Sequence, residues 1–470
     1  KESSAASDVY KRQPKRWHGS GDSARLVFGQ LRSAGCGRDA AKISRAETGG
    51  GGSLSERVFY VETGAEMTKY QQANRLQHVR YDVRGKNMLE AQRMEAAGQR
   101  ILKLNIGNLK PFGFDAPDSV VRSMIAHLPE SEGYSDSHGI YTARTAVANH
   151  YQSYGIDVDV PQVMLGNGVS ELISMVLQAL INPGDEILIP SPDYPLWTGQ
   201  ATLTGGRAVH YLTDEDNGWA PDLDDIRAKI SPATRAIVVI NPNNPTGAVY
   251  TREVLQGIVD IAREHELIIL SDEIYEKIIY EGEHIHLAKL AGDDVLCLTF
   301  SGLSKSYRAC GYRAGWLVWT GPIEDAKSLL EGLHLLANMR MCANVPGQHA
   351  IQTCLGGFQS IDELIKPGGR FHDQIQLSAE LLNDIPGVSC VPAKGALYLF
   401  PKLDPEVYPI DDDEDWALQL LRRKKILISH GRGFNWPTPD HFRMVALPEE
   451  AVLRDALGRI AEFCAETRVR

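Results

Sequence analysis

From about residue 112 to about residue 367, short apolar runs alternate with segments that are apolar along one face of a helix. Apolar runs such as "AIVVI" and "LIIL" predict buried strands, and the amphipathic segments between them predict helices. One such segment begins after Thr251, which suits an N-cap. Its apolar face is formed by Leu255, Ile258, Val259 and Ala262. The alternation predicts an α/β fold with a mostly parallel sheet flanked by helices on both faces.

Three of the predicted strands lead directly into polar residues. "AIVVINPNNPTG" contains Asn244, "LIILSDEIY" reaches Asp272, and "VLCLTFSGLSK" ends at Lys305. Each residue alone is more often a turn, a helix cap or a surface group than a functional residue. In open α/β sheets, however, ligands bind beyond the carboxyl ends of the strands. We therefore expect these three side chains to meet in one crevice.

These residue types together suit pyridoxal phosphate. The cofactor needs a lysine that forms an imine with its aldehyde, and a carboxylate that keeps the pyridine nitrogen protonated. It also needs donors to its phenolate oxygen, which stabilise the anionic form. Lys305 and Asp272 can fill the first two roles, and Asn244 and Tyr275 can fill the third.

The stretch "LGNGVSELISMVLQAL" predicts a glycine-containing turn that leads into a helix. A phosphate is favoured at a helix N-terminus, where backbone N–H groups lack partners. The candidate phosphate ligands here are Gly168, Val169 and Ser170. A lone G-x-G turn is weak support, but Arg313 adds a planar guanidinium that matches phosphate oxygens, and Ser304 adds a hydroxyl.

The motifs "NPNNPTG", "SDEIY" and "SGLSKSYRACGYRAG" resemble the signatures of class I aminotransferases of fold type I. The resemblance extends from about Arg75 to the C-terminus. Arg308 departs from the general lysine-site pattern, which prefers a small residue there, but it matches the bacterial alanine (glutamate–pyruvate) aminotransferase subgroup. The resemblance implies the fold type I PLP-transferase fold, with pyridoxal 5'-phosphate as cofactor.

The resemblance also implies roles for residues outside these motifs. Tyr194 would stack on the pyridine ring, Arg443 would bind the substrate α-carboxylate, and the backbone of Gly107 would approach the substrate. Tyr134 would reach the cofactor phosphate of a neighbouring subunit, which implies a homodimer. We further hypothesise that Tyr81 and Arg84 contact the second carboxylate of glutamate. The alternative for Arg84 is a surface ion pair.

The implied reaction is transamination between L-alanine and 2-oxoglutarate, giving pyruvate and L-glutamate through a Lys305 imine. Lys305, Asp272 and Tyr275 would be the catalytic residues, and small amino acids and 2-oxoacids the substrates. An aspartate- or valine-preferring aminotransferase, or a PLP-dependent β-lyase, would share every cofactor residue. A transcription regulator with an aminotransferase-like domain is the non-enzymatic alternative. It is disfavoured because residues 1–66 lack the apolar periodicity of a winged helix.

Residues 1–66 differ in composition from the rest of the chain. They contain "GGGG", a Ser/Ala/Gly bias and little apolar periodicity, and Met67 offers a natural start. We predict a disordered or non-native extension, with a mitochondrial-type transit peptide as the alternative. Residues 111–367 are expected to form the large PLP-binding domain. The resemblance joins residues 67–110 to residues 368–470 in a smaller α+β domain built from both chain ends.

The chain has 470 residues and a net charge of -11, without a dense basic block, which argues against a nucleic-acid partner. Its apolar runs are too short to span a bilayer. The seven cysteines are widely spaced and include no C-x-x-C pair. That pattern predicts a reduced, cytoplasmic chain with core thiols and no metal site. Cys310 lies near Lys305 in sequence, but core filler is the favoured interpretation.

Overall fold

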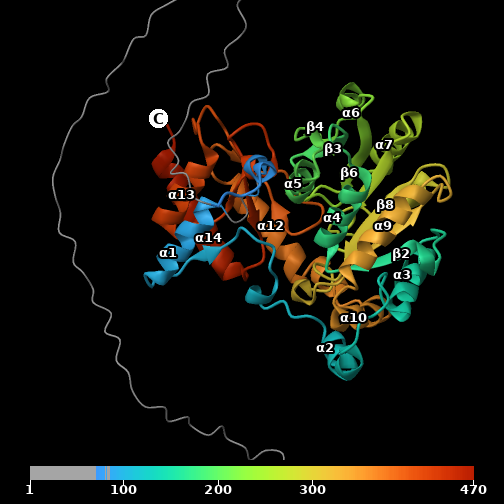
Figure 1. Cartoon of the computed structure of the whole chain (residues 1–470). Coiled ribbons are helices and arrows are strands. Elements are labelled where there is room, and N and C mark those ends of the chain that lie inside the picture. Colours follow the sequence, from blue (N-terminus) through green and yellow to red (C-terminus); the bar gives the residue numbers. More distant parts are fainter. Residues whose placement is uncertain (1–69, 80, 82–84, 470) are drawn as a thin grey trace, which may run out of the picture. The chain divides into compact units, whose positions relative to one another are not determined.

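A sheet of eight strands is the largest sheet in the described part of the chain (Figure 1). The computed structural model describes residues 70–79, 81 and 85–469. The expectations for residues 1–66 and for Arg84 lie outside the described residues. The strands run in the order β2 (Val163–Gly166), β9 (Gly315–Thr320), β8 (Cys297–Gly302), β7 (Ile268–Asp272), β6 (Thr234–Ile240), β3 (Glu186–Ser191), β4 (Arg207–Asp214) and β5 (Ala220–Pro221).

The strand directions confirm the prediction of a mostly parallel sheet. β8, β7, β6, β3 and β4 are parallel to one another, whereas β9 is antiparallel to both β8 and β2, and β5 is antiparallel to β4. In the central strand β6, Ile237 and Val239 belong to one hydrophobic core. Ala236 and Val238 belong to the core on the opposite face. Both faces of the sheet are therefore covered, as the near-continuous apolar runs require.

Helices cover each face. The core that contains Ile237 includes residues of α2 (Asp118–His127), α3 (Tyr141–Ser153), α6 (Leu223–Lys229), α7 (Arg252–Glu264), α8 (Leu287–Ala291) and α10 (Val345–Gly356). The opposite core includes residues of α4 (Val169–Leu180), α5 (Leu196–Leu203) and α9 (Lys327–Arg340). α7 forms as predicted: the Thr251 hydroxyl accepts a hydrogen bond from Val254 N at 3.4 Å, and the predicted apolar residues are buried.

Segments from both ends of the described chain share further cores. β1 (Leu102–Lys103) pairs in parallel with β13 (Ile426–Leu427). A second sheet joins β11 (Tyr398–Leu399), β15 (Phe442–Val445) and β14 (Ser429–His430), and β10 (Val388–Ser389) pairs with β12 (Lys402–Leu403). The helices of this region are α1 (Lys86–Ala96), α11 (Asp362–Ile365), α12 (Arg370–Asn383), α13 (Asp413–Lys424) and α14 (Glu450–Thr467) (Figure 1). The domain boundaries themselves stay a prediction.

Short 3-10 helices complete the described chain: η1 (Asn74–His78), η3 (Lys110–Phe112), η4 (Leu128–Ser131), η5 (Val160–Gln162), η6 (Cys310–Tyr312) and η7 (Gly431–Phe434). No helix within residues 70–79 and 85–469 combines the length and the apolar character needed to cross a bilayer.

The cysteine prediction is partly wrong. The six described cysteines are free, and Cys297, Cys354, Cys390 and Cys464 are buried, as expected. Cys310 and Cys342 are only partly buried. Cys310 is not core filler, because it lies in η6 at the wall of a cavity.

Candidate active site

The ends of three neighbouring strands form the floor of a cavity of about 240 Å³. β6, β7 and β8 lie side by side and parallel, so the residues that follow them meet at one edge of the sheet. Asn244, Asp272 and Lys305 all line the cavity. The convergence expected from strand order is therefore observed.

Lys305 lies in a confined part of this cavity. Its Nζ donates a hydrogen bond to the Gly107 carbonyl oxygen at 3.0 Å. A Cβ atom at Gly107 would lie 2.5 Å from the Tyr398 hydroxyl and 3.3 Å from Lys305 Nζ. A side chain at Gly107 would thus displace the groups around the amine, and this explains why a glycine stands there.

Asp272 ends β7 with its side chain buried. The indole Nε1 of Trp197 donates to Asp272 Oδ2 at 3.2 Å, and the backbone N of Ile274 donates to Oδ1 at 3.4 Å. Burial raises the pKa of Asp272 to about 6, because no cation compensates the carboxylate strongly enough. A protonated pyridine nitrogen would supply the missing positive partner.

A pair of tyrosines lies beside the lysine. The hydroxyls of Tyr275 and Tyr398 are hydrogen-bonded at 2.8 Å. Burial raises the pKa of Tyr275. Burial acts in the same direction on Tyr398, but Lys305 and Arg443 outweigh it and lower the pKa of that phenol. The pair can therefore share a proton next to Lys305.

The N-terminus of α4 and Arg313 form a second polar region of the cavity wall. Val169, Ser170 and Arg313 all line the cavity. Arg313 Nη2 donates to Ser170 Oγ at 3.3 Å and to the Asn167 carbonyl oxygen at 3.1 Å. Gly168 adopts a φ of +79°, and a Cβ there would collide with the Arg313 guanidinium. A cation at a helix N-terminus is a suitable binding site for a phosphate dianion.

Arg443 lies on β15, buried in the cavity wall. Its Nη1 donates to Asn244 Oδ1 at 2.9 Å, and its Nη2 donates to the Asn105 carbonyl oxygen. The guanidinium also lies 4.3 Å from the ring centre of Tyr398 and 4.4 Å from that of Phe434. In the described part of the chain, none of these partners is a carboxylate, and Nε has no hydrogen-bond partner. A buried cation in this setting requires an anionic ligand.

Tyr194 and Tyr81 close part of the cavity. Their hydroxyls lie 3.2 Å apart, in hydrogen-bond contact, and both residues line the cavity. Tyr134 is different, because it is 80% exposed and does not line this cavity. Its expected contact with a neighbouring subunit stays a prediction.

Most of the residues singled out in the sequence line the cavity: Tyr81, Gly107, Val169, Ser170, Tyr194, Asn244, Asp272, Tyr275, Ser304, Lys305, Arg313 and Arg443. Gly168 supports the wall through its contact with Arg313. Sequence reasoning missed Ile106, Ile240, Ile274, Cys310 and Tyr398 as cavity residues. The single tyrosine in the apolar run "ALYLF" was the available signal for Tyr398.

The cavity fits pyridoxal phosphate. It combines a confined lysine amine, a buried carboxylate with a raised pKa, and cations that lack carboxylate partners in the described chain. The fold and this site define a pyridoxal-phosphate-dependent transferase. The chain belongs to the family "Aminotransferase class I and II", whose sequence model matches residues 99–460.

Named relatives are similar over most of their length. A protein of Escherichia coli named glutamate-pyruvate aminotransferase AlaA is 55% identical over 399 residues, which cover 84% of this chain and 98% of that protein. A protein of Mycobacterium tuberculosis named alanine aminotransferase is 58% identical over 402 residues, which cover 85% of this chain and 94% of that protein. The crystal structure of an aminotransferase from Escherichia coli superposes with a TM-score of 0.84 at 54% identity, covering 86% and 100%.

Proposed function

We propose that this chain transfers the amino group between L-alanine and 2-oxoglutarate, giving pyruvate and L-glutamate. The observation that carries the proposal is the composition of the cavity: Lys305 shares it with the buried Asp272 and with Arg443, whose charge no described carboxylate balances. The names of the relatives that are 55% and 58% identical support the choice of substrates.

The residues divide into those that hold the cofactor and those that hold the substrate. Arg313, Ser170, Val169, Gly168 and Ser304 would bind the phosphate, Tyr194 would cover the ring, and Asp272, Asn244 and Tyr275 would contact its nitrogen and phenolate oxygen. When bound, pyridoxal phosphate supplies an aldehyde that condenses with amines and a ring that withdraws electrons from the adjacent carbon.

Residues of the chain itself would bind and orient the amino acid and transfer its Cα proton. Arg443 would pair with the α-carboxylate of the amino acid, which fixes the orientation of the Cα–H bond. Lys305 would take the Cα proton on its amine and deliver it to the neighbouring reacting carbon. The carbonyl oxygen of Gly107 accepts a hydrogen bond from Lys305 Nζ at 3.0 Å and so holds this amine in place.

Glutamate brings a second carboxylate that alanine lacks. Tyr81 lies at the cavity wall, and Arg84 follows it three positions later, outside the described residues. We propose that this segment contacts the second carboxylate. Loss of a charge-assisted hydrogen bond costs roughly 1.5–3 kcal/mol, so Arg84→Ala should reduce efficiency roughly 10- to 150-fold for glutamate and hardly at all for alanine.

The proposal includes a homodimer and a cytoplasmic location. Several large apolar side chains on and beside α3, α9 and α10 are exposed in the single chain: Tyr134, Tyr141, Leu335, Met339 and Phe358. Burial of such a surface by a second copy would explain it. The expected mass in solution is twice that of the chain, as measured by light scattering. Free cysteines in the described residues fit a reducing compartment.

The test is a set of half-reactions with the purified full chain saturated with pyridoxal phosphate. Single-turnover absorbance changes are recorded with L-alanine, L-glutamate, L-aspartate and L-valine, and then with pyruvate and 2-oxoglutarate. We expect efficient reaction with alanine and glutamate and efficiencies lower by at least about 10²-fold with aspartate and valine. Ethylamine, which is alanine without its carboxylate, is the matched control for Arg443 and should react very slowly.

Other outcomes would identify a different function. Equal efficiency with aspartate or valine would contradict alanine specificity while leaving transamination intact. Release of pyruvate and ammonia from a cysteine conjugate without an oxoacid acceptor would indicate a β-lyase. Reaction with none of these compounds would contradict the proposal as a whole.

A further inference from the structure

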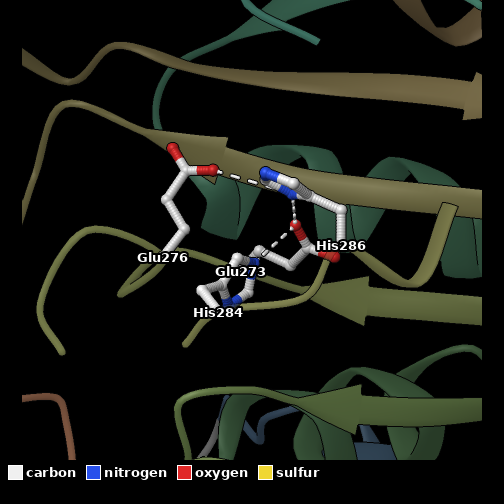
Figure 2. A group of neighbouring side chains, drawn as sticks. All are labelled: Glu273, Glu276, His284 and His286. Carbon is white, nitrogen blue, oxygen red and sulfur yellow. Dashed lines mark hydrogen bonds and ion pairs between the residues drawn. The ribbon is translucent and has the colours of Figure 1, made fainter. Parts of the chain in front are cut away.

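A second buried polar region lies behind the cavity, on the far side of the segment that carries Asp272. Two carboxylates and two imidazoles meet there, and we name Glu273, Glu276, His284 and His286 the Glu/His cluster (Figure 2). The two glutamates follow β7, and the two histidines lie on the loop that leads into α8. None of the four lines the cofactor cavity.

The atoms of the cluster are close enough to share one ion. One donor atom from each residue lies within 4.8 Å of the others. His284 Nε2 is 3.1 Å and His286 Nδ1 is 2.5 Å from Glu273 Oε2. His286 Nδ1 is also 4.0 Å from Glu276 Oε2, and Figure 2 shows these two side chains pointing toward each other.

The cluster is deeply buried yet incompletely hydrogen-bonded. The side chain of Glu276 is 4% exposed and that of Glu273 is 1% exposed. Even so, Glu276 Oε2 and His284 Nδ1 have no hydrogen-bond partner among the described residues. Buried polar atoms are nearly always paired, because an unpaired one costs about 1–3 kcal/mol. An unpaired carboxylate oxygen that faces an imidazole nitrogen therefore points to a missing ligand.

The charges indicate that this ligand is a cation. Two carboxylates held close together in a buried setting repel each other unless positive charge lies between them. Among the described residues, no lysine or arginine forms an ion pair with Glu273 or Glu276, whose partners within ion-pair distance are histidines. Two nitrogen and two carboxylate donors are a ligand set that suits zinc and similar divalent transition ions.

We propose that the Glu/His cluster is a binding site for one divalent transition-metal ion, of which Zn²⁺ is the best match. Four protein ligands leave no open position in a tetrahedral site, so the role is structural rather than catalytic. The ligands come in two pairs that are close in sequence: E-x-x-E provides the two carboxylates and H-x-H provides the two imidazoles. The ion would tie the loop before α8 to the segment that carries Asp272 and Tyr275.

α3 provides an outer partner for this site. His150 Nε2 lies 3.5 Å from Glu276 Oε1, and Ser301 Oγ donates to the same oxygen at 3.2 Å. Ser271 Oγ donates to Glu273 Oε1 at 2.8 Å. Outer partners of this kind orient metal ligands in known sites. They also leave Glu276 Oε2 as the oxygen free to bind an ion.

The experiment measures metal content in the full chain with pyridoxal phosphate bound. Bound metal is removed with a chelator, and the protein is then dialysed against Zn²⁺. The zinc content per chain is measured by inductively coupled plasma mass spectrometry, and the Zn²⁺ affinity by isothermal titration calorimetry. His286→Gln and Glu276→Gln remove one ligand each. His349→Gln is the matched control, because His349 belongs to a more exposed His/Glu group with His127 and Glu130.

We expect one tightly held Zn²⁺ per chain, a higher Tm in its presence, and Zn²⁺ affinity lowered by at least about 100-fold in His286→Gln. His349→Gln should bind like the unaltered chain. X-ray absorption at the zinc edge of the unaltered chain should show four nitrogen and oxygen ligands that include two imidazoles. That measurement tests the site even if a variant does not fold.

A chain that retains no stoichiometric Zn²⁺, Co²⁺ or Mn²⁺ would overturn the proposal, as would an absorption spectrum without histidine ligands. Equal retention by His286→Gln would also overturn it. None of these readouts depends on transamination, so failure of the metal site and failure of the proposed function are distinguishable.

Discussion

The segment from Asp272 to Glu276 separates two buried regions of opposite charge. On one side, Asp272 and Tyr275 line a cavity whose Lys305 and Arg443 have no carboxylate hydrogen-bond partner among the described residues. On the other side, Glu273 and Glu276 face the imidazoles of His284 and His286. One short segment thus contributes Asp272 and Tyr275 to the cofactor cavity and Glu273 and Glu276 to the Glu/His cluster.

Burial alone does not determine how these carboxylates ionise. Burial raises the pKa of Asp272 to about 6. Burial acts in the same way on Glu276, but His150 and His286 outweigh it and lower the pKa of that carboxyl to about 2. The Asp272 carboxylate has no cation close enough to offset its burial, whereas the histidines near Glu276 favour the ionised form of that carboxyl even without a metal ion. Neutralising Asp272 should therefore raise the stability of the cofactor-free protein, whereas neutralising Glu276 should lower it.

The largest expected effect on activity is at Lys305. Lys305→Ala removes the amine that takes the Cα proton, so transamination should fall by at least about 10⁴-fold, measured as kcat with alanine. Far-UV circular dichroism should be unchanged, because the side chain makes one hydrogen bond to Gly107. Lys305→Arg, which keeps the charge, should be equally inactive. Activity within tenfold of the unaltered enzyme in either variant would contradict the assignment.

Asp272→Asn should separate activity from stability. Without the negative charge opposite the ring nitrogen, proton removal should slow on the order of 10³-fold. The folded-state pKa of about 6 lies above the usual 3.8, so ionising Asp272 lowers stability as pH rises from 3.8 through 6. The cofactor-free variant should therefore be more stable at pH 7.5 by up to about 3 kcal/mol in urea unfolding. A less stable variant would show that the buried charge is already compensated.

Glu276→Gln should do the reverse. The folded-state pKa of about 2 lies below the usual 4.5, so this carboxylate contributes stability above pH 4.5, and the contribution is lost as pH falls toward 2. Urea unfolding of metal-free protein at pH 7.5 should show a loss of about 3 kcal/mol, and a smaller loss at pH 4. Glu283→Gln, on the exposed part of the same loop, is the control. If Glu276→Gln were as stable as Glu283→Gln, the Glu276 carboxylate would not contribute to stability, and the predicted contrast with Asp272 would be wrong.

Tyr398→Phe should have the smallest effect. It removes the hydroxyl that lies 2.8 Å from that of Tyr275, a hydrogen bond of about 0.5–1.5 kcal/mol. We expect kcat to fall roughly 2- to 12-fold, with a shift in the alkaline limb of its pH profile. Tyr280→Phe is the matched control, since the Tyr280 hydroxyl donates to the Ala396 carbonyl oxygen outside the cavity. A profile identical to that of the control would assign Tyr398 to packing.

The strand-end residues were predictable because their signals are local. Asp272 ends a strand, Asn244 and Lys305 come shortly after strands, and parallel neighbours bring such positions together. Tyr398 was not predictable in this way, because it comes from another sheet and meets Tyr275 across 123 positions of the chain. Burial of Cys310 was wrongly predicted because its exposure depends on η6 opening onto the cavity.

The Glu/His cluster was missed for a different reason. "SDEIY" was interpreted for its cofactor residues Asp272 and Tyr275, and no role was assigned to Glu273 within it or to Glu276 directly after it. The spacing E-x-x-E followed by H-x-H was visible, but sequence alone does not show that His284 and His286 turn back onto β7. That return depends on packing of the loop before α8, where Leu287 N donates to Glu273 Oε1 at 3.2 Å.

The pairing of β1 with β13 has a consequence for biosynthesis. Leu102 pairs with Ile426, and Arg443 on β15 donates a hydrogen bond to the carbonyl oxygen of Asn105. A nascent chain emerges N-terminus first, so the partners of residues 102–107 leave the ribosome long after these residues and after the strands of the large sheet. The sheet that carries Asp272 and Lys305 can form before that moment, but the wall that carries Arg443 cannot. Substrate-binding competence therefore arises only after Arg443 has been synthesised.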